Sequence, residues 1–287
     1  MSHHFQFVDV FSEQSFSGNP LPVFLDADGI STEEMQKITR WMNLSETAFL
    51  LPPTDTKADY RVRVFTLTQE LPFAGHPTLG GCHAWLTAGG QSHSEAEIVQ
   101  ECGIGLVTIR RTGSQLAFAA PELIRAGPVD DADLERVANA LQIDRKIIVD
   151  SQWVDNGPGW VAVLLESAEA VLDIEPLRDF PTQIDIGVVG PYGDGADAAF
   201  ELRAIYSDHQ GAIREDPVTG SLNASVAQWL LASGRANAPY IATQGARVGR
   251  LGRIAISQDS EGVVWVGGST RTIIDGDVIA HFGSERQ

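Results

Sequence analysis

The sequence predicts an α/β protein of two similar domains, and three observations support this prediction. The chain has 287 residues, which is about twice the length of an ordinary domain. Segments with the alternation of strands and segments with the spacing of helices follow one another along it. The order of these segments in the first half recurs in the second half, with matching strands 140 residues apart.

The composition is that of an ordinary globular protein with a strong negative charge. Hydrophobic residues make up 43% and charged residues 20%, which excludes disordered, collagen-like and fibrous classes. The net charge of −18 would repel nucleic acid and anionic membranes, so neither is expected as a partner. Because the sequence shows neither a long apolar run nor the pattern of a secretory signal, we expect a cytoplasmic location.

The first half is predicted to run as strand, helix and strand. Residues 5–11 and 60–66 are strand-like, and the second of these runs alternates between apolar and polar residues. A helix is expected over residues 32–42, where Ser31 and Glu34 have the spacing of a capping box. Residues 71–78 then form a turn-rich loop, followed by a helix that ends near Gly90.

The second half repeats this order. Residues 200–206 lie 140 positions after the strand at 60–66, and the same offset places His76 over Asp216. Beyond the loop the offset drifts to 144, as differences in loop length would produce. We therefore expect domains at residues 1–120 and 121–287, with a linker near Pro121 to Pro128.

Two matched loops, each expected to lead into a helix, are the first candidates for a site. They contain His76-Pro77-Thr78 and Asp216-Pro217-Val218-Thr219-Gly220-Ser221. Proline near the first helical position and a Ser or Thr cap leave backbone N–H groups pointing out of the helix start, where they can hold a carboxylate. The same residues are also those of two well-capped helices without a ligand, and both interpretations stay open.

Glu46 is a second candidate. As a strand residue it would share a face with Leu44, Ala48 and Leu50, where a carboxylate is costly unless a partner or a proton relieves its charge. A general acid/base needs that kind of environment. The alternative is that Glu46 lies in solvent at the exit of the preceding helix.

The other polar residues of these loops have several possible roles. His76 could donate a proton, ligate a metal or cap a helix, and Asp216 could orient His76 or cap its own helix. Ser221 lacks the surroundings of a hydrolase nucleophile. No third ligand accompanies His76 and His83, and no dinucleotide or Walker motif is present, so we expect neither a metal nor a cofactor.

Several segments resemble the signatures of one protein family. Residues 43–49, 73–80 and 215–221 resemble those of the PhzF-like phenazine biosynthesis isomerases, and Phe16-Ser17-Gly18-Asn19-Pro20 looks similar too. The resemblance extends from about residue 5 to about residue 280, in the order of the family.

The resemblance implies the fold of the diaminopimelate epimerase-like superfamily. It consists of two pseudo-symmetric α/β domains, each a curved, mostly antiparallel sheet wrapped around a central helix, with the active site between them. In this family the last strand commonly returns to the first domain, which would place residues 272–282 there. Homodimers are usual, so a homodimer is expected.

The resemblance also implies an isomerase that needs no cofactor and acts on a small carboxylate. Glu46 would take a proton from carbon and return it elsewhere, and His76, Asp216 and Ser221 would complete the catalytic set. The substrate carboxylate would lie near four further residues: Asn19, Ser45, Gly75 and Gly220.

Two alternatives stay open beside this isomerase. One is a non-catalytic small-molecule-binding or interaction protein of the same fold, and the other is a dehydratase or racemase of hydroxylated amino acids. The related amino-acid epimerases use two cysteines, one in each domain. Here Cys82 and Cys102 both lie in the first half, and Val226 and Gln244 stand at the matching positions, which disfavours that mechanism. The sequence does not identify the substrate.

Overall fold

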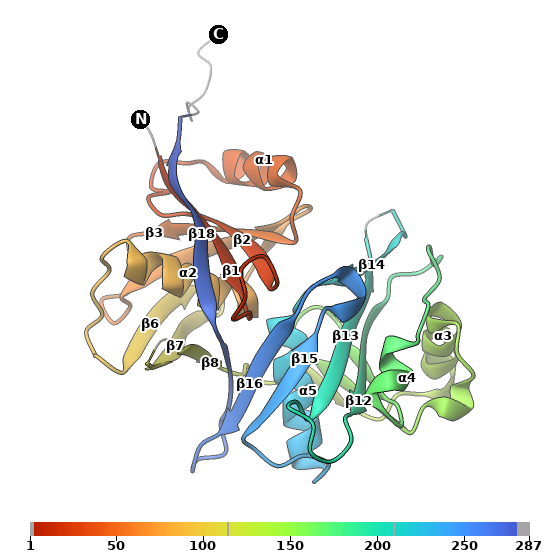
Figure 1. Ribbon diagram of the computed structural model, residues 1–287. Helices are drawn as coiled ribbons and strands as arrows, with labels where there is room; N and C mark the ends of the chain where they lie inside the picture. Colours follow the sequence, from red (N-terminus) through yellow and green to blue (C-terminus); the bar gives the residue numbers. More distant parts are fainter. Residues whose placement is uncertain (1–2, 114, 209, 280–287) are drawn as a thin grey trace. The chain divides into compact units, whose positions relative to one another are not determined.

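The computed structural model describes residues 3–113, 115–208 and 210–279 (Figure 1). The chain forms two compact units. The first contains residues 1–119 and 267–287, and the second contains residues 120–266. The boundary thus falls between Ala119 and Ala120, and the chain returns to the first unit at Gly267.

The first unit is built from a sheet and two helices, in the following order: β1 (His3–Val10), β2 (Asn19–Phe24), α1 (Thr32–Met42), β3 (Glu46–Leu51), β4 (Tyr60–Thr66), β5 (Glu70–Leu71), α2 (Gly75–Thr87), β6 (Glu97–Cys102), β7 (Gly105–Thr112), β8 (Gln115–Ala119) and β18 (Thr270–Val278).

The second unit has a similar set of elements: β9 (Arg125–Gly127), α3 (Asp131–Leu141), the 3₁₀ turn η1 (Arg145–Ile147), β10 (Asp150–Asp155), β11 (Val161–Leu164), α4 (Ala168–Leu172), β12 (Asp185–Pro191), β13 (Phe200–Ser207), β14 (Ile213–Asp216), α5 (Gly220–Ala232), β15 (Tyr240–Gln244), the 3₁₀ turn η2 (Ala246–Val248) and β16 (Gly252–Gln258). Strand β17 (Val264–Gly268) follows. It begins in the second unit and ends in the first, because the boundary falls after Val266.

The strand pairing of the first unit is repeated in the second. In the first unit β2 and β3 are parallel, β3 and β4 antiparallel, and β4 and β6 parallel. In the second unit β11 and β12 are parallel, β12 and β13 antiparallel, and β13 and β15 parallel. The other described ladders are antiparallel, including the hairpins β6–β7 and β15–β16. The repeated pairing confirms the duplication that the 140-residue offset predicts.

One helix in each unit is buried on nearly all sides. Helix α2 packs against β1, β2, β3, β4, β6, β8 and β18, and its residues from Gly75 to Cys82 are all buried. In the second unit α5 packs against β10 and β16, and nine of its residues are buried. These two helices are apolar around most of their circumference, unlike the amphipathic α1 on the outer face. Each unit is therefore a mostly antiparallel sheet around a central helix.

The outer face of each sheet carries a separate hydrophobic core. In the first unit, Phe24, Phe49 and Phe65 pack with Met35 of α1. Phe24 and Phe49 stack with their ring centroids 5.1 Å apart. In the second unit α3 and α4 cover the sheet with a cluster of aliphatic side chains, among them Leu141 and Val171.

Most of the expected elements of the first half are present. Helix α1 begins at Thr32 and ends at Met42 as predicted, and both hydrogen bonds of the Ser31–Glu34 capping box are formed. The loop expected at residues 71–78 is wrong in its second part, because α2 already begins at Gly75. Pro77 is tolerated there since the first helical turn does not need its N–H group.

Three further expectations require correction. Helix α5 begins at Gly220, 145 residues after the first residue of α2, so His76 lies inside a helix while its supposed counterpart Asp216 ends a strand. The expected side-chain caps are not formed. The N-cap residues of α2 and α5 are Ala74 and Thr219, and neither makes a side-chain capping bond. The expected linker contains strand β9, which pairs with β10.

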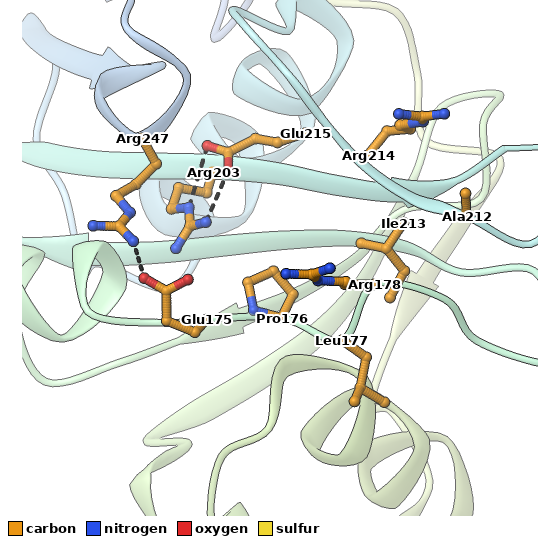
Figure 2. A pocket seen from close by; sticks show the side chains of 10 residues that line it. All are labelled: Glu175, Pro176, Leu177, Arg178, Arg203, Ala212, Ile213, Arg214, Glu215 and Arg247. Carbon is orange, nitrogen blue, oxygen red and sulfur yellow. Dashed lines mark hydrogen bonds and ion pairs between the residues drawn. The ribbon is translucent and has the colours of Figure 1, made fainter.

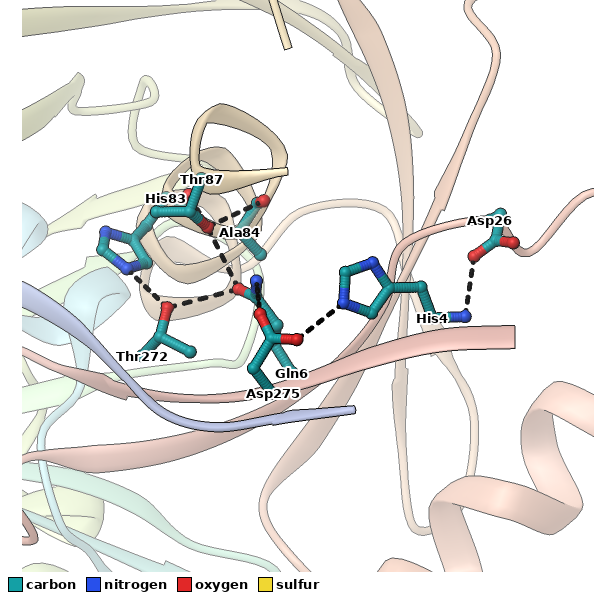
Figure 3. A network of polar contacts seen from close by, with 8 residues as sticks. All are labelled: His4, Gln6, Asp26, His83, Ala84, Thr87, Thr272 and Asp275. Atoms are coloured by element: carbon teal, nitrogen blue, oxygen red, sulfur yellow. Dashed lines mark hydrogen bonds and ion pairs between the residues drawn. The ribbon is translucent and has the colours of Figure 1, made fainter. Parts of the chain in front are cut away.

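The last strand of the first unit is held by a network of polar contacts (Figure 3). Strand β18 pairs antiparallel with β1 over its whole length. Of the segment expected to return, residues 272–279 are described and residues 280–282 lie outside the described part. His83 of α2 contacts the hydroxyl groups of Thr270 and Thr272, at 2.9 Å each. Gln6 of β1 donates to Asp275 at 2.7 Å, so α2, β1 and β18 are tied together.

The glycine pair of α2 gives a matched test of this packing. A Cβ atom at Gly80 would lie 2.5 Å from Leu21 Cδ2 and 2.9 Å from Val10 Cγ2, and both neighbours are fully buried. We expect Gly80→Ala to lower the free energy of unfolding by about 1–3 kcal/mol, as overpacking does. At Gly81 the nearest atom is 3.5 Å away, so Gly81→Ala should be neutral or stabilise the helix by up to about 1 kcal/mol.

Denaturant unfolding of the two variants measures both values. Equal effects of the two substitutions would contradict the close approach of α2 to β2.

Candidate active site

Glu46 and His76 come together in the first unit. Glu46 is the first residue of β3 and lies opposite Thr66, whereas His76 is the second residue of α2. The distance from His76 Nδ1 to Glu46 Oε2 is 3.4 Å, and the two side chains are 4% and 17% exposed. Glu46 is therefore not in solvent at the helix exit, which was the alternative for this residue.

The imidazole of His76 is neutral. Burial lowers the pKa of His76 to about 3, so the ring carries no charge near neutral pH. At 3.4 Å its contact with Glu46 is longer than an ordinary hydrogen bond. The other ring nitrogen, Nε2, is buried and has no hydrogen-bond partner among the described residues. The site thus holds a carboxylate beside an uncharged ring whose second nitrogen remains available to a ligand.

A tight loop positions Asn19, one of the residues expected to bind substrate. The carboxylate of Asp9 accepts the backbone N–H groups of Ser17 at 3.0 Å and Gly18 at 2.9 Å. A side chain at Gly18 would place Cβ 2.1 Å from the carbonyl oxygen of Val10, so only glycine fits this approach. Asn19 follows as the first residue of β2 and is 1% exposed.

Two other residues of the expected binding set flank the pair. Ser45 immediately precedes β3 and Gly75 opens α2, so each is the sequence neighbour of a member of the Glu46–His76 pair. The N-cap residue Ala74 makes no side-chain capping bond to the first turn of α2. A helix start in this state favours a negative charge nearby.

Asp216 of the second unit is held by a buried polar cluster. It ends β14 and is 9% exposed. The Thr219 hydroxyl group donates to Asp216 Oδ2 at 2.6 Å, and Gln244 Nε2 donates to the Thr219 hydroxyl oxygen at 2.9 Å and to the Asp216 carbonyl at 3.1 Å. Gln244 thereby holds the backbone carbonyl of Asp216 directly and its carboxylate through the Thr219 hydroxyl group.

The amide oxygen of Gln244 completes the cluster. It accepts the Thr219 backbone N–H at 3.0 Å and the Asn223 amide at 2.8 Å. Gln244 is 1% exposed, and all four of its contacts span more than 20 residues of sequence. The roles of Thr219, Asn223 and Asp9 were not predicted, because contacts between distant residues leave no periodic pattern in a sequence.

Ser221 lies in the first turn of α5 and presents a hydroxyl group with one defined partner. Trp160 Nε1 donates to Ser221 Oγ at 3.2 Å, and Asn156 donates to the Ser221 carbonyl at 2.9 Å. Since the indole can only donate, the Ser221 hydroxyl accepts there and keeps its own proton for another acceptor. Gly220, expected to bind substrate, is the first residue of this helix.

The predicted site residues therefore fall into two sets. Asn19, Ser45, Glu46, Gly75 and His76 belong to the first unit, and Asp216, Gly220 and Ser221 belong to the second. Among the residues that the structure describes, there is no group of three or more His, Cys, Asp or Glu side chains that could hold a metal ion. Over the same residues, no helix is long and apolar enough to cross a membrane.

The buried His76 predicts a loss of stability in acid. In the unfolded chain this residue takes up a proton near pH 6.5, whereas in the folded protein it stays neutral down to about pH 3. The unfolded state binds the extra proton between these values, so the free energy of unfolding falls as the pH falls through this range. One such group contributes a slope of up to about 1.4 kcal/mol per pH unit.

Denaturant unfolding between pH 7 and pH 4 measures this slope. We expect His76→Gln to reduce the slope by the contribution of His76, while the control His93→Gln, at a side chain that is 71% exposed, leaves it unchanged. His83, whose pKa is also lowered by burial, contributes to the slope in both variants. An unchanged slope in His76→Gln would contradict a neutral buried imidazole.

The cluster around Gln244 predicts that replacing this one side chain lowers the stability of the protein strongly. Gln244→Leu removes the Gln244 bonds to the Thr219 N–H, the Thr219 hydroxyl group, the Asn223 amide and the Asp216 carbonyl, although the Asn223 amide keeps its bond to the Thr219 carbonyl. We expect it to lower the free energy of unfolding by about 3 kcal/mol or more, since each buried unsatisfied group costs about 1–3 kcal/mol. Gln228→Leu, which removes one bond to the Pro121 carbonyl, is the control and should cost about 1 kcal/mol. Similar losses in the two variants would contradict the assigned role of Gln244.

Comparisons with solved structures identify the fold. A PhzF family protein from Bacillus anthracis superimposes with a TM-score of 0.81 at 21% identity, covering 98% of this chain and all of that one. A hydroxyproline epimerase from Agrobacterium vitis, with bound trans-4-hydroxy-L-proline, gives a TM-score of 0.58 at 13% identity, over 96% of this chain and 91% of its own. These similarities confirm the expected diaminopimelate epimerase-like fold.

Comparisons of sequence identify the family. The family model described as "Phenazine biosynthesis-like protein" matches residues 8–278. The protein "Antisense-enhancing sequence 1" of Schizosaccharomyces pombe is 34% identical over 96% of this chain and 98% of its own. The trans-2,3-dihydro-3-hydroxyanthranilate isomerase of Pseudomonas chlororaphis is 37% identical over 61% of each chain. The chain is thus an isomerase, and it belongs to the phenazine biosynthesis-like, or PhzF, family.

Proposed function

We propose that this chain catalyses a cofactor-independent isomerisation in which Glu46 moves a proton between two carbon positions of a small carboxylate. The observation that carries the proposal is the contact between Glu46 Oε2 and the buried Nδ1 of His76 at 3.4 Å. A proton on carbon is removed by a positioned base in a site that excludes water. A carboxylate that is 17% exposed beside an uncharged ring fits this requirement.

His76 supplies polarity without adding a charge. A histidine cation at this distance would pair with Glu46 and neutralise it, but burial lowers the pKa of His76 to about 3. The ring therefore orients Glu46 while leaving its negative charge available for proton abstraction. Its buried Nε2, which lacks a partner among the described residues, supports a second role in binding substrate.

The residues of the second unit are suited to binding and stabilising an anion. The hydroxyl proton of Ser221 and the backbone at Gly220 lie in the first turn of α5, where the helix dipole favours negative charge. In this proposal they hold the substrate carboxylate or the charge that develops after proton loss. Thr219 and Gln244 fix Asp216, which completes the acid/base set.

The names of three relatives support a substrate class. Three curated relatives are named trans-2,3-dihydro-3-hydroxyanthranilate isomerase, and that molecule is a small ring with a carboxylate, an amine and a hydroxyl group. We propose a substrate of this class for the present chain. The homodimer and the cytoplasmic location remain predictions.

A substitution of the proposed base tests the mechanism. In deuterated water, trans-2,3-dihydro-3-hydroxyanthranilate should acquire deuterium at carbon during turnover, because the base exchanges its proton with solvent. We expect Glu46→Gln to reduce this incorporation by about 10²–10⁴-fold. The control Glu33→Gln changes an exposed carboxylate of α1 and should leave the rate unchanged.

Mass spectrometry of the recovered substrate and product measures the exchange. Undiminished exchange in a folded Glu46→Gln protein would exclude Glu46 as the base. Saturable binding by the native protein without any exchange would instead favour a non-catalytic member of this fold.

The racemase alternative is supported by the structural similarity to the hydroxyproline epimerase. The cysteines argue against it as a two-thiol reaction, because Cys82 is fully buried and burial raises its pKa to about 12. Burial also raises the pKa of Cys102. Incubation with trans-4-hydroxy-L-proline and chiral analysis of the product would distinguish this activity from the isomerisation.

A further inference from the structure

The second unit contains a cavity lined by the segment from Glu175 to Arg178 and by residues of β13 and β14 (Figure 2). Its volume is about 440 Å³, which is in the range of small-molecule sites. Glu215 lines the cavity and bonds to Arg203, while the next residue, Asp216, bonds to Thr219 at the start of α5. By the alternation of a strand, the side chains of Glu215 and Asp216 point to opposite faces of β14. Arg214, on the other side of Glu215 in sequence, lines the cavity as well.

The cavity arises from a difference between the two copies of the duplicated fold. In the first unit Arg63 of β4 bonds to Glu70 at 2.6 Å and 2.7 Å and to Thr32 at 3.0 Å, at the start of α1. Helix α1 has 11 residues and covers this part of the sheet. In the second unit the corresponding Arg203 bonds to Glu215, but the helix at this place, α4, has only 5 residues. The shorter helix leaves the sheet surface beyond its end open.

Arg203 forms the closed back wall of this cavity. Its side chain is 3% exposed, and it bonds to Glu215 at 2.8 Å and 3.2 Å. Two further N–H groups reach the carbonyl oxygens of Val171 at 3.1 Å and Ile174 at 2.7 Å, near the end of α4. Four of its five N–H groups are used in these bonds and its side chain is buried, so Arg203 is a structural residue that is not expected to bind a ligand directly.

Three further arginines give the cavity a positive charge that is unusual in a chain of net charge −18. Arg214 is paired with Asp208 at 3.2 Å, and Arg247 with Glu175. The Arg178 guanidinium makes no hydrogen bond or ion pair with the described residues, and Figure 2 shows it between Pro176 and Ile213. The lining contains four arginines and two glutamates, so it carries an excess of positive charge.

The ion pair at the mouth of the cavity can open at low cost. Arg247 and Glu175 are 40% and 75% exposed, and exposed pairs of this kind contribute little to stability. If Glu175 turns into solvent, the guanidinium groups of Arg178 and Arg247 face the same cavity. Each can bind two oxygens of one anion in a planar, bidentate manner. Leu177 and Ile213 supply apolar surface for a carbon skeleton.

We propose that this cavity is a binding site for a small metabolite with a doubly charged oxyanion group, held by Arg178 and Arg247. A phosphate monoester and a dicarboxylate both carry such a group. Either ligand would displace Glu175 from Arg247. The cavity lining includes none of the proposed catalytic residues, so in this proposal the ligand differs from the molecule that is isomerised.

Direct binding measurements test the proposal. Isothermal titration calorimetry of the full chain at low ionic strength uses inorganic phosphate, succinate and acetate as probes. We expect saturable binding of phosphate or succinate at least tenfold tighter than that of acetate. Tighter binding of phosphate would identify a phosphate ester as the ligand class, and tighter binding of succinate would identify a dicarboxylate.

Variants locate the binding. Arg178→Gln and Arg247→Gln should each weaken the preferred dianion at least tenfold, while Arg178→Lys weakens it less because it keeps the charge. The control Arg253→Gln, in the same unit but outside the cavity, should bind within twofold of the native protein. Unliganded melting temperatures show whether the variants are folded. Absence of dianion binding, or equal binding in native protein and both Gln variants, would overturn the proposal.

Discussion

The architecture of each unit depends on burying one helix within a curved sheet. A helix surrounded by strands must offer small side chains wherever the sheet comes close, and α2 does so with Gly80, Gly81 and Ala84. Helix α5 meets the same demand differently, since Leu222 packs against β12 where Gly187 leaves room for it. Close packing of this kind leaves the helix little freedom to move within the sheet. The side chains on the first turn of the helix, such as His76 on α2 and Ser221 on α5, are then held in place with it.

The chemistry of the candidate site follows from that rigidity. His76 is buried because it belongs to the central helix, and burial, rather than a partner, keeps its ring neutral. Glu46 approaches it from the first position of a strand that packs on the same helix. In the other unit, Thr219 and Gln244 hold Asp216 just before α5 begins. Both units thus place polar groups at the start of a buried helix, where a ligand's negative charge is favoured.

The sequence predicted local structure better than long-range contacts. Helix α1 was predicted with its bounds and its capping box because all its signals lie within a few residues. The start of α2 was misplaced because Gly75-His76-Pro77 has the composition of a turn, and packing overrides that preference. Glu46 and His76 were candidates from strand alternation and from the matched loops, and the family resemblance gave them a joint role. Their proximity depends on the pairing of β3 with the sheet around α2. Asp9 had no signal of its own, and Thr219 was expected only as a helix cap, because bonds to residues 9 and 25 positions away form no local pattern.

The return of β18 to the first unit affects the order in which the protein can be completed. The second unit is continuous in sequence, whereas the first consists of two segments that flank it. During synthesis from the N-terminus, all of residues 120–266 leave the ribosome before the strand that pairs with β1. Until then β1 has one unpaired edge, which is a template for pairing with other chains. The nascent first unit therefore passes through a stage that favours association with other chains, and the second unit can finish folding during that stage.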